Sequence, residues 1–447
     1  MSFLREIKIK SFQWRHVIFE IWRKNQLLLL KQPTLFVSLI SFSMSTIVVF
    51  LLGIENLRFG DAEDYLNAAI AIYNFEVYPR EASLPFFRPP GYPLLIAGVW
   101  FISGEGNIFA LKCLNILCHS ISSYLTYRIA SGVFTGRKAM LAAVIFACNP
   151  FSLFMVSTIS TEPFTTLLFL LFVISLTGKD YYLKYFSLII SVLLIVSTRP
   201  EYFFVVTPIL AALIVIRSTS KILRNQSLVA LVILLISIFA WGNANTKATG
   251  DFIPFTDAAN YHLWVGSTEI IRENYAVQEL GNLDFDTVQY NRLMDQIELK
   301  KSQWGESYAK GSLKDRQELW WNAYSANVTQ MGLPNYFLLL LYKGVVFWRP
   351  FLNPGSYTPL ELLATTPFLV VFTVGFLIGL IQLKAWKSFR KLIYINLFAL
   401  IVLTGVHMFQ QPDLRYRLPI FLPISCILLS HSFSTALSKK RAKHDSV

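Results

Sequence analysis

Charged residues are scarce in this sequence. Only 15% of its 447 residues are charged, whereas 54% are hydrophobic. A soluble globular protein carries about a quarter charged residues, so this composition excludes an ordinary soluble protein. The hydrophobic residues recur in runs close to the roughly 20 residues that a helix needs to cross a bilayer. The sequence therefore predicts an all-α polytopic membrane protein.

Cysteine is scarce as well. All four cysteines lie within apolar segments, and none stands at metal-ligand spacing from a histidine: Cys113, Cys118, Cys148 and Cys426. Neither a disulfide framework nor a zinc site is indicated. Residues 1–33 also lack the short basic stretch and the cleavage site of a secretory signal. Their basic residues alternate with Phe, Trp and Ile, which favours an amphipathic helix on the inner leaflet.

The net charge of +13 would suggest nucleic acid in a soluble chain, but we expect no nucleic-acid partner here. Short basic loops orient membrane helices, and residues 217–226 and 384–391 are such loops. With the N-terminus inside, the pattern predicts about ten transmembrane helices with both ends in the cytoplasm. The predicted spans are 34–52, 107–129, 138–156, 164–177, 181–197, 202–217, 228–244, 360–383, 391–409 and 416–435.

Two other apolar stretches are poor candidates for spans. Residues 92–103 are too few, and residues 335–348 contain a lysine in mid-run. We expect both to be re-entrant or interfacial helices on the outer side. The predicted organisation is a basic amphipathic segment (1–33), a transmembrane domain (34–435) and a cytoplasmic basic tail (436–447).

Polar sequence is concentrated on the outer side, in loops 53–106 and 245–359. Within the second loop, residues 287–331 have helical periodicity, whereas 256–275 look partly irregular. No internal repeat and no separate soluble domain is recognisable. Any chemistry is therefore expected to face outward.

The first outer loop opens with an acidic segment that suits a helix over residues 61–75. Asp61, Asp64 and Tyr65 fall on one helix face, at spacings of three and four. Helix capping alone explains the two aspartates, with Asp61 as N-cap and Asp64 as its partner. A capped first turn also holds a carboxylate rigidly, so a functional role remains open.

Arginines and one further acid stand at the other outward turns. Arg88 precedes two prolines, which stiffen the backbone, and Glu162 stands at a predicted helix start. Arg199 lies at an outward turn, and Arg415 and Arg417 lie at the outer end of the last span. Each has a structural alternative, such as an ion pair or snorkelling to the interface. Together they indicate a cavity, because ionisable groups at membrane depth usually face one.

The two residue types suit a lipid with a phosphate head. Arginine donates bidentate hydrogen bonds to phosphate, and a carboxylate serves as a base or binds a divalent cation. In this order the motifs resemble the C-type membrane glycosyltransferases, in particular the protein O-mannosyltransferase and lipid A aminoarabinose transferase group. The motifs are DAEDYLNAA (61–69), RPPGYPLL (88–95), STEPF (160–164), STRPEYF (197–203) and RYRLPIFLPI (415–424).

The resemblance implies a membrane-embedded enzyme that takes its sugar from a polyprenyl-phosphate-linked donor. Asp61 matches the catalytic carboxylate of the family, although Ala62 follows it where relatives often have glutamate. Glu162 matches a second acid, which would orient the acceptor or help Asp61 to hold a divalent metal ion. In-line attack on the anomeric carbon would invert its configuration.

The remaining site residues are assigned by charge and position. The candidates for the donor phosphate are Arg88, Arg199, Arg415 and Arg417, followed by Lys343 and Arg349. The candidates for other substrate contacts are Asp64, Tyr65, Tyr92 and His262. The acceptor would be a glycolipid, a polysaccharide or a protein.

A flippase or transporter for a lipid-linked sugar is the alternative, because charges and broken helices in the membrane also fit that class. The lack of an inverted repeat and the gathering of polar groups at one face favour the transferase. The resemblance favours a bacterial inner membrane, with the site facing outward among membrane lipids.

Overall fold

The computed structural model describes residues 32–55, 57, 61–76, 88–134, 136–177, 181–217, 219–268, 287–350, 359–381, 390–410, 412 and 414–444. Within these ranges every regular element is a helix, which confirms the all-α prediction. The predicted amphipathic segment 1–33 lies almost wholly outside the described residues.

The first half of the chain contains α2 (Pro33–Leu52), α3 (Asp61–Tyr73), α4 (Gly91–Ser103), α5 (Ile108–Ser131), α6 (Gly136–Ala147), α7 (Pro150–Val156), α8 (Glu162–Thr177), α9 (Tyr181–Thr198), the 3-10 helix η1 (Pro200–Tyr202), α10 (Phe203–Val215) and α11 (Lys221–Thr249). The second half contains α12 (Ala259–Ser267), α14 (Thr287–Trp304), α15 (Glu306–Ala309), α16 (Leu313–Met331), α17 (Leu333–Phe347), α18 (Pro359–Ile381), α19 (Arg390–Phe409), the 3-10 helix η5 (Leu414–Arg417) and α20 (Leu418–His444).

Helices occupy all ten intervals that were predicted as spans. Four of them, α2, α5, α11 and α19, are long and apolar enough to cross a membrane, and the bent pair α6 and α7 gives a fifth. The chain is thus an integral membrane protein, whereas the number ten stays a prediction. The two short apolar stretches are the helices α4 and α17, and their interfacial position also stays a prediction.

The predicted span 138–156 is not one straight helix. It is broken into α6 and α7, which meet at an angle of 50°. Asn149 causes the break, because its side-chain oxygen accepts hydrogen bonds from the backbone N–H groups of Phe151 and Ser152 and so caps a new helix. Pro150 follows at the first helical position, where its missing N–H costs nothing.

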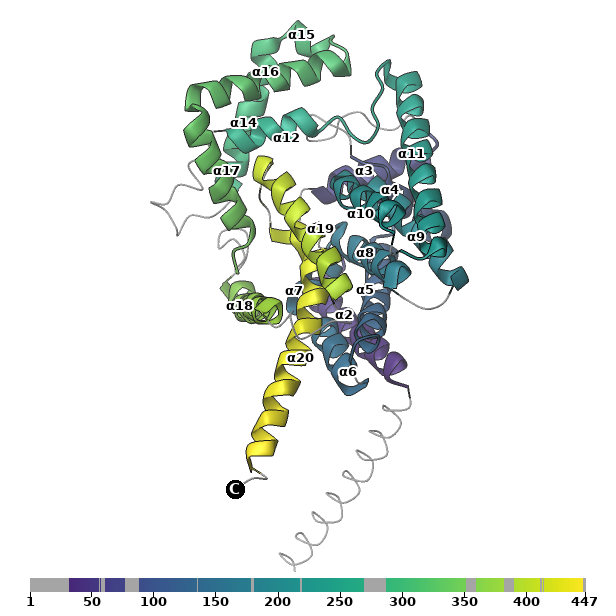
Figure 1. Ribbon diagram of the computed structural model, residues 1–447. Coiled ribbons are helices and arrows are strands. Elements are labelled where there is room, and N and C mark those ends of the chain that lie inside the picture. The colour runs from purple at the N-terminus through teal and green to yellow at the C-terminus, as the bar shows by residue number, and fades with distance from the viewer. Residues whose placement is uncertain are drawn as a thin grey trace, which may run out of the picture.

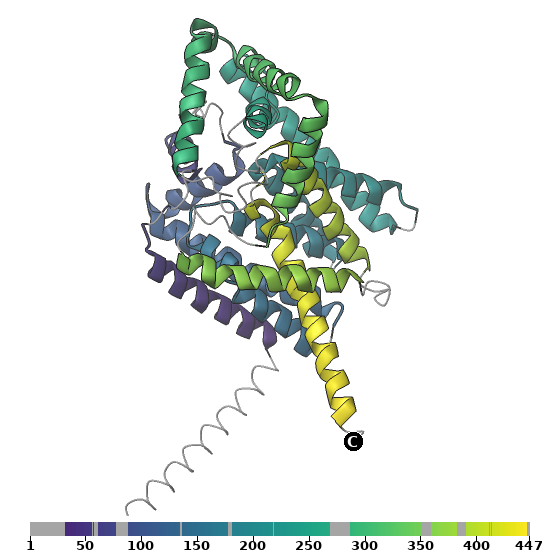
Figure 2. The ribbon, with the colours of Figure 1, turned by 90° about the vertical axis from the view of Figure 1, so that its left-hand side faces the viewer.

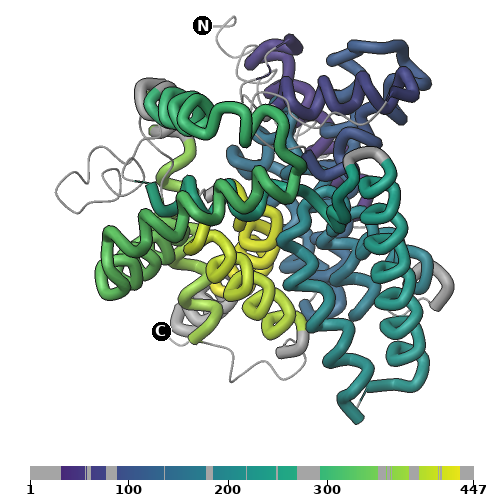
Figure 3. The backbone as a smooth tube through the Cα atoms, turned by 90° about the horizontal axis from the view of Figure 1, so that it is seen from above, coloured from purple at the N-terminus to yellow at the C-terminus, as the bar shows by residue number. Residues whose placement is uncertain are grey.

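The helices form an apolar bundle with a second layer at one end (Figure 1). This cap layer consists of α12, α14, α15 and α16, and α17 leads from it back along the bundle (Figure 2). Viewed from the cap layer, α19 lies in the middle of the bundle and packs against α17 on one side and α10 on the other (Figure 3). The last turns of α20 extend beyond the other described helices.

The cap layer has a hydrophobic core of its own, separate from the main core of the bundle. Trp320 lies at its centre, completely buried, with the rings of Trp264 and Trp304 each 4.7 Å away. The helical prediction for residues 287–331 is confirmed by α14, α15 and α16. Residues 256–275 were expected to be partly irregular: residues 256–258 are irregular, whereas 259–267 form α12, because their apolar side chains pack into this core.

Candidate functional site

A cavity of about 300 Å³ lies where chain segments that begin or end at the turns predicted to face outward converge. Its walls come from α3, the turn before α4, the loop before α8, the turn around η1, α12, the end of α19 and η5. Six of the residues singled out in the sequence line it: Tyr65, Arg88, Glu162, Arg199, His262 and Arg415. Segments up to 350 residues apart thus meet in one place.

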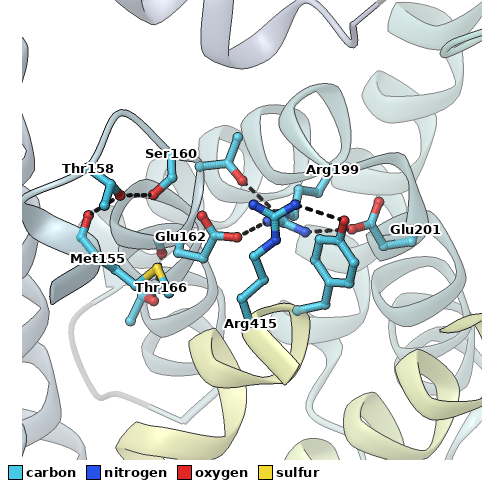
Figure 4. Close-up of polar contacts among 10 residues, drawn as sticks. Met155, Thr158, Ser160, Glu162, Thr166, Arg199, Glu201 and Arg415 are labelled. Atoms are coloured by element: carbon cyan, nitrogen blue, oxygen red, sulfur yellow. Dashed lines mark hydrogen bonds and ion pairs between the residues drawn. The ribbon is translucent and has the colours of Figure 1, made fainter. Parts of the chain in front are cut away.

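Arg199 is the centre of the polar contacts in this cavity (Figure 4). Its Nη2 donates to Oε1 of Glu162 at 2.5 Å, and its Nη1 donates to Oε1 of Glu201 at 3.2 Å. Its Nε donates to the hydroxyl of Thr161 at 2.9 Å. The fork geometry of a guanidinium allows these three directions at once. Arg199 therefore neutralises two carboxylates in the cavity wall.

Glu162 is the first residue of α8 and is only 3% exposed. Its second oxygen, Oε2, is buried and has no hydrogen-bond partner among the residues that the structure describes. A buried polar atom without a partner costs free energy. Because Glu162 also lines the cavity, its carboxylate is a candidate partner for a ligand there.

The loop that carries Glu162 is held from behind by α5. The side-chain amide of Asn115 donates to the backbone carbonyl of Thr158 at 2.7 Å. The ammonium of Lys112, which is completely buried, donates to the carbonyl of Ser157. These carbonyls follow α7, where the last four C=O groups of a helix lack partners within the helix. Both side chains of α5 thus fix the start of α8.

Arg88 approaches the cavity from the turn before α4. It forms an ion pair with Asp64 of α3, with 2.7 Å between Nη2 and Oδ2, and its guanidinium lies 5.1 Å from the ring centroid of Tyr65. Asp64 is buried and holds Arg88 in place. Tyr92 is buried behind this group and packs edge-on against Tyr65 at 5.1 Å, so it supports the wall without lining the cavity.

Gly91 determines how closely this turn approaches Arg199. A Cβ atom at Gly91 would lie 2.6 Å from the backbone carbon of Ser197 and from the nitrogen of Thr198. No real side-chain carbon sits that close, so only glycine lets α4 begin against the end of α9. The glycine of the RPPGYP motif therefore brings the Arg88 turn next to the Arg199 turn.

The far wall comes from the C-terminal part of the chain. The guanidinium carbons of Arg199 and Arg415 lie 4.7 Å and 5.1 Å from the ring centroid of Tyr416. The Nη2 of Arg415 also donates to the Tyr416 hydroxyl at 3.3 Å. His407 stacks on the same ring, with 4.4 Å between the centroids. This stack holds η5 against the end of α19.

Three cations that were candidates for the donor phosphate do not line the cavity. Arg417 is fully buried, and its Nη2 donates to the backbone carbonyl of Arg349 at 2.6 Å. Its guanidinium lies about 5 Å from the rings of Trp348 and Phe421. Lys343 is also fully buried and donates to the carbonyl of Gly266 in α12 at 3.0 Å. Their contacts fasten helices to one another.

Asp61 is the first residue of α3, which confirms the predicted helix start. Its side chain lies outside the described part of the structure, so its catalytic role stays a prediction. The described residues contain no group of three histidine, cysteine, aspartate or glutamate side chains that could hold a metal ion. Of the predicted metal pair, Glu162 is bonded through one oxygen to Arg199.

Sequence reasoning missed several side chains of the cavity, including Thr161, His407, Gln410 and Tyr416. Thr161 and Tyr416 stand inside the quoted motifs, directly beside Glu162 and between two arginines, so their position was a usable signal. His407 and Gln410 end an apolar helix, and nothing in the local sequence distinguishes them.

A second cavity, of about 190 Å³, adjoins the first and shares Pro89, Pro200 and Phe255 with it. It lies between α4, α9 and α11, and its other walls are mainly aliphatic and aromatic side chains such as Leu193 and Trp241. A polar cavity and an apolar cavity thus share a wall of two prolines and a phenylalanine.

Comparison with known proteins finds one matching family model and several similar solved structures. Residues 87–241 match the family model of the dolichyl-phosphate-mannose-protein mannosyltransferases. The matched segment covers about a third of the chain and includes Arg88, Glu162 and Arg199. A comparison with curated protein sequences returned no significant match.

Among solved structures, the chain is similar to the apo oligosaccharyltransferase of Archaeoglobus fulgidus, with 16% identity and a TM-score of 0.53 over 93% of this chain. The chain spans about half of that protein, 52% of its length. The oligosaccharyltransferase AglB of the same organism, solved with an inhibitory peptide and a dolichol-phosphate, is also 16% identical, with a TM-score of 0.47 over 94% of this chain and 52% of AglB.

A further similar structure is ArnT of Cupriavidus metallidurans bound to undecaprenyl phosphate. It is 12% identical, with a TM-score of 0.39 over 91% of this chain and 77% of ArnT. At these identities the similarity to the apo oligosaccharyltransferase supports the fold alone. The structures of AglB and ArnT, with TM-scores of 0.47 and 0.39, support no conclusion. The family match and this fold together confirm the resemblance to the C-type membrane glycosyltransferases that the motifs predicted.

Proposed function

We propose that this protein is an integral-membrane glycosyltransferase that moves a sugar from a polyprenyl-phosphate donor to an acceptor on the outer face of the membrane. The observation that carries the proposal is the meeting of Arg88, Arg199, Arg415 and Glu162 on one cavity of about 300 Å³. The acceptor is a glycolipid, a polysaccharide or a protein. The site faces outward from a bacterial inner membrane.

The arginines suit the phosphate of the donor. The cavity receives guanidinium groups from three separate segments, and permanently charged donors stabilise the negative charge that develops on a departing phosphate. Arg199 is already engaged with two carboxylates. Arg415, with the hydroxyl of Tyr416 beside it, and Arg88 are further candidates for the phosphate.

The apolar cavity suits the polyprenyl chain. A lipid phosphate has a charged head and a long hydrocarbon tail, and the two adjoining cavities offer one environment for each. Burial of hydrocarbon stabilises binding by about 25 cal/mol per Å². The shared wall of Pro89, Pro200 and Phe255 is then the place where head and tail join.

The two acids supply the remaining chemistry. Polyprenyl phosphate leaves readily at neutral pH, so the reaction needs a base for the acceptor hydroxyl rather than a general acid. Asp61 is the proposed base, and Oε2 of Glu162 orients the acceptor hydroxyl. Attack opposite the leaving phosphate inverts the anomeric carbon.

The test is transfer of labelled sugar from polyprenyl-phosphate donors to an envelope extract by the purified chain in detergent. Asp61→Asn should abolish transfer in a folded protein. Glu63→Gln is the matched control, because Glu63 stands on the same helix with an exposed side chain, and it should leave transfer unchanged. Full activity of Asp61→Asn removes the assigned base. Sugar movement that requires a sealed vesicle would instead favour a flippase.

A further inference from the structure

The cap layer contains a polar groove that the proposed reaction does not use. It has a volume of about 240 Å³ and lies among α12, α14 and α16. Six of its lining residues carry a carboxamide or a hydroxyl: Ser267, Thr268, Gln296, Gln303, Asn327 and Gln330. Among the described residues that line it, Lys300 is the one charged residue.

Packed side chains close the bottom of the groove, and three glutamine side chains also line it. The amide of Asn327 donates to the hydroxyl of Ser267 at 3.2 Å, which ties α16 to α12. Trp264, buried in the cap-layer core, closes the bottom. In contrast, the side chains of Gln296, Gln303 and Gln330 form no hydrogen bond with the part of the chain that the structure describes. A ligand can therefore be bound without breaking existing contacts.

The chemistry of this lining selects the class of ligand. A carboxamide offers donors and an acceptor in one plane, which matches adjacent sugar hydroxyls, since each of these both donates and accepts. A single lysine is too little for a nucleotide or a phosphate-rich ligand. An extended peptide would use a free strand edge or a row of apolar pockets, and the described lining provides neither.

Helix α12 stands between this groove and the charged cavity. His262 lines the cavity, whereas Trp264 lines the groove. Two residues along a helix are about 200° apart around its axis, so these side chains face opposite sides of α12. The two sites are thus separated by about one helix diameter, roughly 10 Å.

We propose that the groove binds a neutral oligosaccharide, which on the proposed function is the glycan part of the acceptor. The terminal sugar then reaches past α12 into the cavity beside His262, while preceding units are held by the amides of α14 and α16. The acceptor is accordingly a glycan or glycolipid rather than a peptide.

Binding is tested with the full chain in detergent by saturation-transfer NMR. The probes are neutral oligosaccharides released from the cell envelope and, separately, uncharged peptides of similar mass. Oligosaccharides should bind, and Gln296→Ala with Gln330→Ala should weaken binding about tenfold, the loss expected for two hydrogen bonds. Asn322→Ala is the matched control, because Asn322 is exposed on α16 and does not line the groove, and it should bind normally.

Three results of the binding experiment would overturn the proposed glycan site: no oligosaccharide binds, the double variant binds as well as the parent, or the peptides bind in its place. A Glu162→Gln variant separates this proposal from the proposed function. It should lose transfer and keep oligosaccharide binding, since Glu162 lies in the other cavity. Transfer with an unchanged KM for acceptor in the double variant would refute the groove and leave the transferase standing.

Discussion

Replacing Arg199 by glutamine should destabilise the protein more than any replacement of its partners. Arg199 is 7% exposed and Glu162 is 3% exposed, so the pair is buried. Loss of the guanidinium leaves Glu162 as an uncompensated charge, and removing one member of a buried pair costs about 3–5 kcal/mol. Glu162→Gln should cost less, about 1.5–3 kcal/mol, because Arg199 still donates to Glu201 and Thr161.

The combined variant distinguishes this electrostatic reason from a loss of packing. Arg199→Gln with Glu162→Gln removes both charges, so its cost should be smaller than the sum of the two single costs by about 1–3 kcal/mol. The free energy of unfolding is measured by SDS denaturation in mixed micelles, followed by circular dichroism. Lys310→Gln is a suitable control. Its ion pair with Glu306 is exposed, so its loss should not measurably change the free energy of unfolding.

Two outcomes contradict the reasoning. If Arg199→Gln unfolds at the same SDS concentration as the parent, the buried pair does not hold the α8 and α9 ends together. If the two single costs simply add, the two side chains do not interact energetically, whatever their distance. In either case Arg199 would be free for a phosphate, and its role in the proposed function would change.

Three further predictions concern the walls of the site. Gly91→Ala should lower transfer about 10- to 100-fold, since a shift of 1 Å suffices for such a loss, whereas Gly98→Ala, whose Cβ would meet no atom within 4 Å, should transfer normally. Asn115→Leu should lower the unfolding free energy by about 1–3 kcal/mol, and an unchanged SDS midpoint would show that its hydrogen bonds to the loop before α8 are dispensable. Arg415→Met should raise the KM for the donor, and Arg417→Met should not; equal effects would contradict the division between cavity and interior.

The helices could be predicted because their signal is local. Apolar runs, basic loops and the periodicity of residues 287–331 each depend on neighbouring residues, and every predicted span contains a helix. Two local features were misjudged or missed. The span 138–156 reads as continuous, yet the Asn149 cap breaks it. The helix at 259–267 has a weak pattern of its own and is stabilised by Trp320, more than 50 positions away.

The sequence indicated candidate residues for the site, but it could not tell those that line the cavity from those that are buried elsewhere. Arg415 and Arg417 stand symmetrically around Tyr416, and the sequence gives no reason to prefer one. In the 3-10 helix η5, with three residues per turn, residues two apart point in different directions. Arg415 consequently faces the cavity, and Arg417 lies among Trp348 and Phe421. The direction of a short helix depends on its tertiary contacts, which a local motif does not contain.

The basic residues in apolar surroundings therefore have two separate functions. Arg88 and Arg199, at the cavity, pair with carboxylates. Lys112, Lys343 and Arg417 are each fully buried, and each donates to a backbone carbonyl at or just beyond the C-terminal end of α7, α12 or α17. Those carbonyls have no partner within their helix and lie at the negative end of its dipole. In this protein, therefore, the buried cations that lie away from the cavity bind the ends of helices, and their burial alone does not indicate a ligand.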